Sequence, residues 1–313
     1  MRAVLVGNYG VGNFGDEALK DYFLGAYPEV EWTVLSARPG AGEYPRLPIG
    51  IRSFFRTPWW QALRVIKRSD AVVFGGGTLF TDIESVKACW LWGVHALVAR
   101  CFGVPVYLAF QGVGPFCTRI GKGIARYVVR SARYVSVRDT ASFERVSTWR
   151  PDAIETFDPV FSLFVQRKKA RADDGSYVLI PRHNSGASFD RIVDFHVAEA
   201  KGSVVIAAFQ PDDRGERSVV ERLLHRFPST SVRRVSNVDD LMELLSHAGR
   251  CVTERFHGAL AAVAAGAPLS TVSQADGDKI SGVSATFSSP EVFSSALRRV
   301  QAGESSLRTA LQH

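Results

Sequence analysis

The chain has 313 residues, of which 46% are hydrophobic and 22% charged, and its formal net charge is +7. This composition excludes disordered and fibrous proteins, and the length predicts two domains or one large one. The basic balance favours anionic partners: phosphorylated substrates, nucleic acid or an anionic membrane surface. The longest apolar stretch, 89–99, is too short for a membrane span, and the apolar run before Gly7 is too short for a secretory signal, so we expect neither.

The four cysteines, Cys89, Cys101, Cys117 and Cys251, form no Cys-x-x-Cys pair and have no histidine at ligand spacing. We expect reduced thiols, mostly buried, and no cysteine-based zinc site.

In the first half of the chain, apolar β-rich runs alternate with helical periods. The expected strands are 3–7, 32–36, 71–74, 104–110 and 134–137, and the expected helices are 16–26, 59–68, 84–101, 119–132 and 140–148. Continuous apolar strands joined by helices predict a parallel sheet with helices on both faces.

A polar, charged segment, 166–175, predicts a linker, after which the same alternation restarts. The expected strands are 177–180, 204–209, 232–235 and 251–253, and the expected helices are 189–200, 217–227, 239–248, 258–265 and a tail from Pro290. We therefore predict an α/β protein with two Rossmann-like domains facing across a cleft. The expected limits are 1–165, 176–289 and, for the helical tail, 290–313. In such sheets ligands bind outside the carboxyl ends of the strands.

The first strand runs into a glycine-rich turn with the spacing Gly-x-Gly-x-x-Gly at residues 10–15. This spacing is typical of dinucleotide binding. However, Asp16 and Glu17 begin the helix where a pyrophosphate would lie, and carboxylates repel it there. We expect Asp16 to cap the helix and the loop to bind a sugar or another polyhydroxyl ligand instead. The residues expected to contact this ligand are Asn8, Gly10, Asn13, Asp16 and Glu17.

A second glycine loop follows the strand at 71–74. Three successive glycines, Gly75, Gly76 and Gly77, leave backbone N–H groups open to an anion or a close-lying sugar, and the alternative is a mobile turn. Because each glycine costs about 1 kcal/mol of chain entropy relative to alanine, we favour the functional interpretation and include Thr78 in the predicted substrate contacts.

The turn at 253–260 follows a strand and opens a helix of small residues. A helix N-terminus with a fixed guanidinium is a ready anion site. In an extended turn Arg255 and His257 point the same way, and they supply a permanent charge and a proton that titrates near neutral pH. A lone histidine is more often structural, but this placement favours a functional role.

Five segments taken in order, 7–18, 75–82, 136–139, 158–159 and 255–257, resemble the polysaccharide pyruvyl transferases. The most specific are the first glycine loop and the Arg-x-His turn. The resemblance implies transfer of the enolpyruvyl unit of phosphoenolpyruvate onto two sugar hydroxyls, which gives a cyclic ketal. It also implies the two-Rossmann fold called GT-B, and neither a metal nor another cofactor.

Individual residues follow from the resemblance. Arg255 and His257 match the family's Arg-x-His, which is taken to hold phosphoenolpyruvate. Arg182 ends the first strand of the second half, where the family commonly has an arginine. Lys279 falls where the family often has a Tyr-Asp-Pro-Lys-like element, here reduced to Asp-Gly-Asp-Lys. Arg138 and Asp139 belong to a segment that resembles the family, and a structural ion pair at a strand end is an equally good interpretation of them.

The expected mechanism places phosphoenolpyruvate on the C-terminal domain and the acceptor on the N-terminal domain. His257 contacts the phosphate and acts as general acid, and Asp16 or Glu17 orients or deprotonates the sugar hydroxyl. Two alternatives stay open: a metal-independent GT-B glycosyltransferase that uses a nucleotide sugar, and an inactive sugar-binding relative.

The helix expected at 119–132 carries a basic stripe, and Ile120, Ile124 and Val128 form a separate apolar line for the sheet. The stripe consists of Arg119, Lys122, Arg126, Arg130 and Arg133. It is either a solvated face or a contact with an anionic membrane, because acceptors of such enzymes are often carried on lipid diphosphates. We expect a cytoplasmic protein of cell-envelope polysaccharide synthesis, with a sugar or lipid-linked saccharide acceptor and no nucleic-acid partner. If the stripe contacts lipid, the protein lies at the inner face of the membrane.

Overall fold

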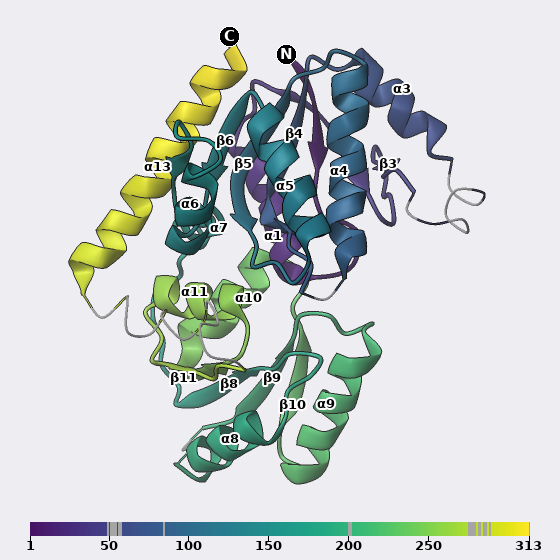
Figure 1. The fold of residues 1–313 in the computed structure, drawn as a ribbon. Coiled ribbons are helices and arrows are strands. Elements are labelled where there is room, and N and C mark those ends of the chain that lie inside the picture. The colour runs from purple at the N-terminus through teal and green to yellow at the C-terminus, as the bar shows by residue number, and fades with distance from the viewer. Residues whose placement is uncertain are drawn as a thin grey trace. The chain divides into compact units, whose positions relative to one another are not determined.

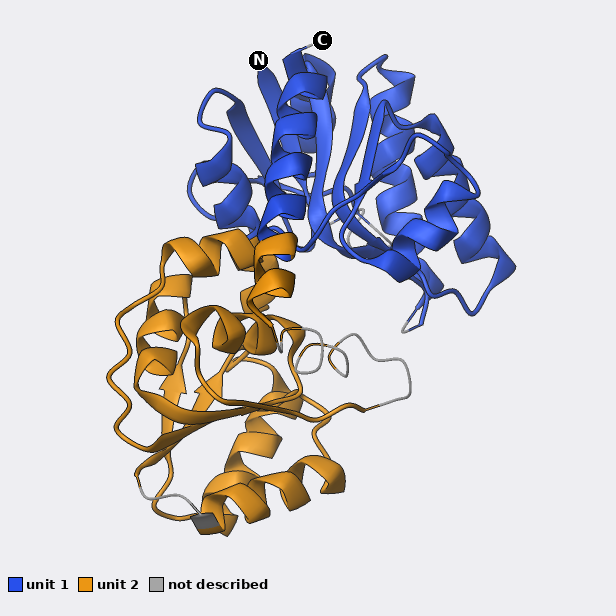
Figure 2. Cartoon of the chain, turned by 90° about the vertical axis from the view of Figure 1, so that its left-hand side faces the viewer, with its two compact units in different colours: residues 1–11, 19–159, 296–313 blue, residues 12–18, 160–295 orange. Residues whose placement is uncertain are grey.

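The computed structural model describes residues 1–48, 50, 55, 58–83, 85–199, 202–274, 280, 283, 287 and 289–312. These residues form two parallel β-sheets, each covered by helices (Figure 1). The chain divides into two compact units (Figure 2): unit 1 holds 1–11, 19–159 and 296–313, and unit 2 holds 12–18 and 160–295.

The sheet of unit 1 has the strand order β3-β2-β1-β4-β5-β6-β7. Its strands are β1 (Arg2–Val6), β2 (Glu31–Ser36), β3 (Tyr44–Pro45), β4 (Ala71–Phe80), β5 (Val106–Val113), β6 (Tyr134–Val137) and β7 (Ile154–Glu155). The accompanying helices are α1 (Phe14–Ala26), α3 (Trp60–Arg68), α4 (Val86–Cys101), α5 (Arg119–Ser131), α6 (Thr140–Ser147) and α13 (Pro290–Gln312). Helical crossovers allow the parallel pairing of this sheet, as α1 does between β1 and β2, whereas β2 and β3 pair in parallel through the non-helical segment 37–43.

The alternation of side chains along β1 assigns the two faces of this sheet. Val4 and Val6 belong to a buried cluster that includes Trp92 of α4 and Val128 of α5. α4 and α5 lie side by side over this face (Figure 1), and they cross so closely that a Cβ on Gly93 would come within 2.6 Å of Ile124. The aromatic and Gly303 contacts of Phe110 bring α1 and α13 to the strands as well.

The glycine triplet of unit 1 is not a loop after a strand, as the sequence predicted. β4 continues to Phe80, and all three glycines are buried within it. A Cβ on Gly75 would come within 2.3 Å of the Tyr9 hydroxyl, and one on Gly76 within 2.7 Å of Leu19. Tyr9 also donates a hydrogen bond to the Gly75 carbonyl (2.8 Å). Close packing of neighbouring side chains therefore accounts for Gly75 and Gly76, and the positive φ of Gly77 (80°) favours glycine there.

The sheet of unit 2 has the order β10-β9-β8-β11-β12. Its strands are β8 (Ser176–Ile180), β9 (Val204–Ala208), β10 (Ser231–Arg234), β11 (Ala248–Thr253) and β12 (Leu269–Thr271). The helices are α7 (Val160–Gln166), α8 (Ala187–Glu199), α9 (Arg214–Arg226), α10 (Val238–His247) and α11 (Phe256–Ala265). The segment between α7 and β8, predicted as the linker, has no regular structure, but it lies within unit 2 rather than between the units. Arg171 ties it to the Leu245 and Ala248 carbonyls.

The limits of the compact units differ from the expected domain limits at three places. Residues 12–18 and 160–165 group with unit 2, and 296–313 group with unit 1. All four cysteines are free thiols, but Cys101 and Cys117 are exposed, so the expectation that most are buried is wrong. No described helix is both long and apolar enough to span a bilayer.

Candidate active site

The crevice of unit 2 lies where its strand order reverses. From β8 the chain proceeds to β9 on one side, and it later returns to β11 on the other, so β8 and β11 are neighbours. Ligands bind outside the carboxyl ends of strands at such a point. Thr253 joins the two strand ends, since its hydroxyl donates to the Ile180 carbonyl (3.2 Å). Gly258 lets α11 begin close to them, because a Cβ there would come within 2.8 Å of that hydroxyl oxygen.

The side chain of Arg255 is turned into the protein. Its Nε donates to the Pro181 carbonyl (2.7 Å), one terminal nitrogen donates to Gln210 (3.1 Å), and the other pairs with Glu216. The guanidinium also lies 5.6 Å from the centre of the Phe209 ring. Burial lowers the pKa of Arg255 to about 10. Arg255 therefore joins the segments that follow β8, β9 and β11, and we interpret it as a positioning residue.

His257 has different neighbours, although we expected it to point the same way as Arg255. Its imidazole packs on the first turn of α1, and a Cβ on Gly15 would come within 2.1 Å of its Nδ1. Phe14, next in that turn, packs 4.5 Å from the Phe209 ring and 6.4 Å from the Phe164 ring, centre to centre. The first glycine loop thus contributes 12–18 to unit 2, directly against the Arg-x-His turn.

The first turn of α1 begins at Asn13 rather than at Asp16. The Asn13 side-chain oxygen accepts the Gly15 N–H (3.1 Å), and the Asn13 backbone carbonyl accepts the N–H groups of Asp16 and Glu17 (both 3.1 Å). The predicted capping role of Asp16 is therefore wrong. Asp16 and Glu17 stand, half-buried, in the first helical turn, where the helix dipole favours carboxylates.

Glu254 is a buried carboxyl group at the end of β11 that the sequence did not single out. Ser185 donates its hydroxyl to Glu254, and the Gln274 amide donates to the same oxygen (3.2 Å). Burial raises the pKa of Glu254, while the two hydrogen bonds and nearby Arg182 act in the opposite direction. This network links the segments that follow β8, β11 and β12.

Arg182 lies half-buried in the segment after β8. Its charge lowers the pKa of Arg255, so the two guanidinium groups are close together. Across the described ranges its guanidinium forms no hydrogen bond or ion pair, whereas its backbone N–H donates to the Ser185 hydroxyl (2.8 Å) and its carbonyl accepts the Ser185 N–H (3.2 Å). Arg182 therefore offers a cation to a ligand in the crevice. Lys279 lies outside the described residues.

The remaining predicted contacts belong to unit 1. Asn8 accepts a hydrogen bond from Arg46 (3.2 Å), and Gly10 lies against Ser36, where its positive φ of 74° favours glycine. Thr78 accepts from Arg138 (2.9 Å).

Arg138 does form an ion pair of structural character, but its partner is not Asp139. It pairs with buried Asp158 (2.5 Å). Asp139 caps α6 instead, by accepting the Ser142 N–H (2.8 Å).

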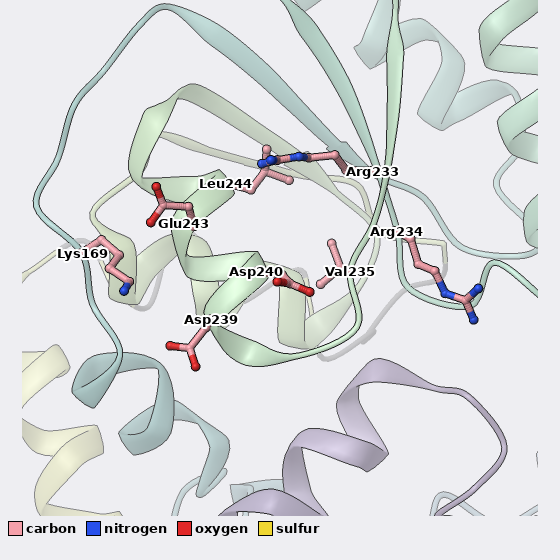
Figure 3. A pocket seen from close by; sticks show the side chains of 8 residues that line it. All are labelled: Lys169, Arg233, Arg234, Val235, Asp239, Asp240, Glu243 and Leu244. Carbon is pink, nitrogen blue, oxygen red and sulfur yellow. The ribbon is translucent and has the colours of Figure 1, made fainter.

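A pocket of about 420 Å³ lies elsewhere in unit 2, between the linker, β10 and α10 (Figure 3). Cations and carboxylates both line it, so it has no clear preference for an anion, and none of its residues is a predicted site residue. They are Lys169, Arg233, Arg234, Val235, Asp239, Asp240, Glu243 and Leu244. Among the described residues we find no cluster of histidine, cysteine and carboxylate side chains suited to a metal ion.

Solved structures of other proteins share the fold of the chain. UDP-GlcNAc 2-epimerase from Methanocaldococcus jannaschii matches at 12% identity and a TM-score of 0.64, over 100% of both chains. UDP-GlcNAc 2-epimerase from Neisseria meningitidis, bound to UDP-GlcNAc, matches at 12% identity and a TM-score of 0.65, over 100% of both chains. Anabaena HepE, in complex with UDP and glucose, matches at 11% and 0.54 over 99% of this chain and 97% of that one. The predicted α/β fold of the GT-B type is confirmed.

The sequence itself identifies the family. The model of the polysaccharide pyruvyl transferase family matches residues 13–274, and the chain belongs to this family. No curated protein matches the sequence. The predicted family membership is thus confirmed, and it implies a transferase that acts on a polysaccharide.

Proposed function

We propose that the protein transfers a pyruvyl group from phosphoenolpyruvate to two hydroxyls of a saccharide and so forms a ketal. The observation that carries this proposal is the guanidinium of Arg182, which has no hydrogen-bond partner among the described residues, beside the N-terminus of α11 in a chain of the pyruvyl transferase family. Both features attract anions, and phosphoenolpyruvate carries a carboxylate and a phosphate. Arg255 holds the walls of this crevice in place rather than contacting the donor.

The chemistry requires one proton donor and one proton acceptor. A sugar hydroxyl adds to C2 of the enol phosphate and loses its proton while C3 receives a proton, and the second hydroxyl then displaces inorganic phosphate to close the ketal. His257, in the first turn of α11, is the proposed general acid. Asp16 and Glu17 follow Gly15, which touches His257, and one of them is the proposed base or orienting group for the hydroxyl.

The donor can be tested without knowing the acceptor. Calorimetric titration of the full chain with phosphoenolpyruvate should show binding that Arg182→Gln weakens by tenfold or more, since a charge-assisted contact contributes about 1.5–3 kcal/mol. Arg191→Gln, an exposed arginine on α8, is the matched control.

The alternative donor is a nucleotide sugar, as the fold neighbours suggest by their bound UDP and UDP-GlcNAc. Incubation with saccharides should release inorganic phosphate from phosphoenolpyruvate and no UDP from UDP-sugars. UDP release without phosphate release would replace pyruvyl transfer by glycosyl transfer, and binding of a saccharide without either product would indicate an inactive relative.

A further inference from the structure

Helix α4 exposes an apolar stripe to solvent. Trp90, Val94 and Leu97 recur at helical spacing and are 51%, 36% and 47% exposed. The opposite side of α4 is buried in the core of unit 1 through Trp92 and Ala96. Isolated exposed apolar residues need no explanation, but a tryptophan, a valine and a leucine aligned on one helix form a contiguous patch.

Helix α5 and the two residues after it place cations beside this stripe. Arg119, Lys122, Arg126, Arg130 and Arg133 are all exposed. Ile120, which the sequence assigned to the sheet, is 59% exposed instead and lies with Tyr127 among these cations. Arg100 of α4 joins the two helices, since it donates to the Ser131 carbonyl (3.3 Å) and lies 5.7 Å from the Tyr127 ring centre. We call the exposed side of these two helices the α4–α5 surface.

The charge of the α4–α5 surface has one sign. Neither α4 nor α5 contains an aspartate or glutamate, and the flanking α3 contains none either. α3 adds two cations. Arg64 lies 4.8 Å from the Trp60 ring centre, and Arg64 and Arg68 line a pocket of about 230 Å³ together with Trp60. These three helices thus present exposed aromatic side chains and cations without a carboxylate.

From these contacts we infer that the α4–α5 surface docks on the surface of an anionic lipid bilayer. The apolar stripe of α4 enters the boundary between headgroups and acyl chains, where tryptophan is favoured, and the cations of α5 bind the headgroups. The inference stands independently of the proposed transfer reaction, because it rests on unit 1 alone.

Charge complementarity selects this occupant over two others. A second copy of the chain would bring two uniformly basic surfaces together, which like-charge repulsion opposes. A nucleic acid would satisfy the cations but leave the Trp90 stripe without an apolar partner. An anionic bilayer satisfies both the cations and the stripe.

The test is co-sedimentation of the full chain with vesicles of phosphatidylcholine, with and without phosphatidylglycerol. We expect binding to the anionic vesicles at low salt and its loss at high salt. Replacing Arg119, Lys122 and Arg126 by glutamine should lower the partition coefficient about a hundredfold. A matched control with equal charge loss replaces Arg191, Arg214 and Arg217 of unit 2 by glutamine, and it should bind nearly as well as the wild type.

The apolar contribution has its own variants. Trp90→Glu with Leu97→Glu should weaken binding strongly, whereas Phe195→Glu, at a 60% exposed phenylalanine of unit 2, should not. Brominated lipids should quench the tryptophan fluorescence of the wild type more than that of Trp90→Phe. Equal binding to neutral and anionic vesicles, undiminished binding of the glutamate variant, or displacement of vesicles by duplex DNA would each overturn the inference.

Discussion

The imidazole of His257 rests on the backbone of Gly15, with no space for a Cβ between them. The two residues are far apart in the sequence, and each belongs to one of the two motifs that most specifically resemble the family. Their contact within unit 2 brings the first turn of α1 to the N-terminus of α11. A glycine is therefore required at residue 15 by packing rather than by a phosphate.

Gly15→Ala should displace His257 and reduce turnover by at least tenfold. Alanine is intrinsically better than glycine in a helix by about 1 kcal/mol, which acts against the strain of the added Cβ, and an unchanged melting temperature would assign the loss to the displaced His257. Gly25→Ala in the same helix is the matched control, because a Cβ added there would meet no neighbouring atom within 4 Å, and it should leave turnover unchanged. Kinetics and thermal melts of both variants test the contact. Wild-type turnover in Gly15→Ala would show that the position of His257 is unimportant.

Arg255→Met should destabilise the protein by about 3–5 kcal/mol, because it leaves Glu216 buried and uncompensated. Arg255→Lys should also destabilise the protein, since an ammonium group cannot bond to Pro181, Gln210 and Glu216 in the same geometry. Chemical denaturation measures both effects.

Arg182→Gln should change the unfolding free energy by less than about 0.5 kcal/mol while weakening phosphoenolpyruvate binding. The two arginines would then be separated into a positioning and a binding role. A stable Arg255→Met variant that has lost the ligand would assign the binding role to Arg255 instead.

Glu254 should make stability fall with rising pH relative to Glu254→Gln. Burial raises its pKa above the usual 4.5, so the folded state binds the proton more tightly than the unfolded chain. The resulting stabilisation is present below the unfolded pKa and is lost as the pH rises through the folded one. Denaturation midpoints from pH 4 upward, compared between wild type and variant, should therefore diverge in favour of Glu254→Gln. Parallel profiles would contradict the raised pKa.

His95 should make unit 1 sensitive to acid. Its Nε2 accepts the Leu47 N–H (3.0 Å), and burial lowers its pKa to about 4 from 6.5. Stability contributed by the neutral ring is present above pH 6.5 and is lost as the pH falls toward 4, by about 3 kcal/mol. The pH profile of His95→Gln should be flatter than that of the wild type, and equal profiles would contradict the lowered pKa.

Asp16→Asn and Glu17→Gln should impair use of the acceptor more than binding of phosphoenolpyruvate. Carboxylates in the first turn of α1 suit hydroxyl groups and repel a dianion. Separate KM values for the two substrates measure this difference. A collapse of phosphoenolpyruvate affinity would reverse the assignment of the donor and acceptor contacts.

Periodicity was sufficient to predict most of the fold, because long apolar strands and amphipathic helices have a clear repeat. The predicted strand 134–137 matches β6 in full, and the helix expected at 119–132 ends one residue beyond α5. The short strands β3, β7 and β12 were missed, since two or three residues cannot display an alternation.

The candidate site was less predictable because its partners come from distant segments. Nothing near Arg255 in the sequence indicates Glu216, which is held in the first turn of α9 by the Asp213 cap (2.9 Å). Gln210, Ser185 and Gln274 carry one usable signal: each follows a strand of unit 2 at its carboxyl end. The glycines of β4 were wrongly predicted to form a loop because glycine is common in turns. In the structure Tyr9 and Leu19 occupy the space that side chains at residues 75 and 76 would need.

Helix α1 runs without a break across residues 18 and 19, where the chain passes from unit 2 to unit 1. The chain passes between its compact units at four points, after Val11, Ala18, Pro159 and Ser295. No single cut separates the units, because a break after Pro159 leaves the turn that touches His257 on the first fragment and most of α13 on the second. A recombination that exchanged one half between relatives would give each unit a foreign piece, so the two units are expected to evolve as a single heritable block.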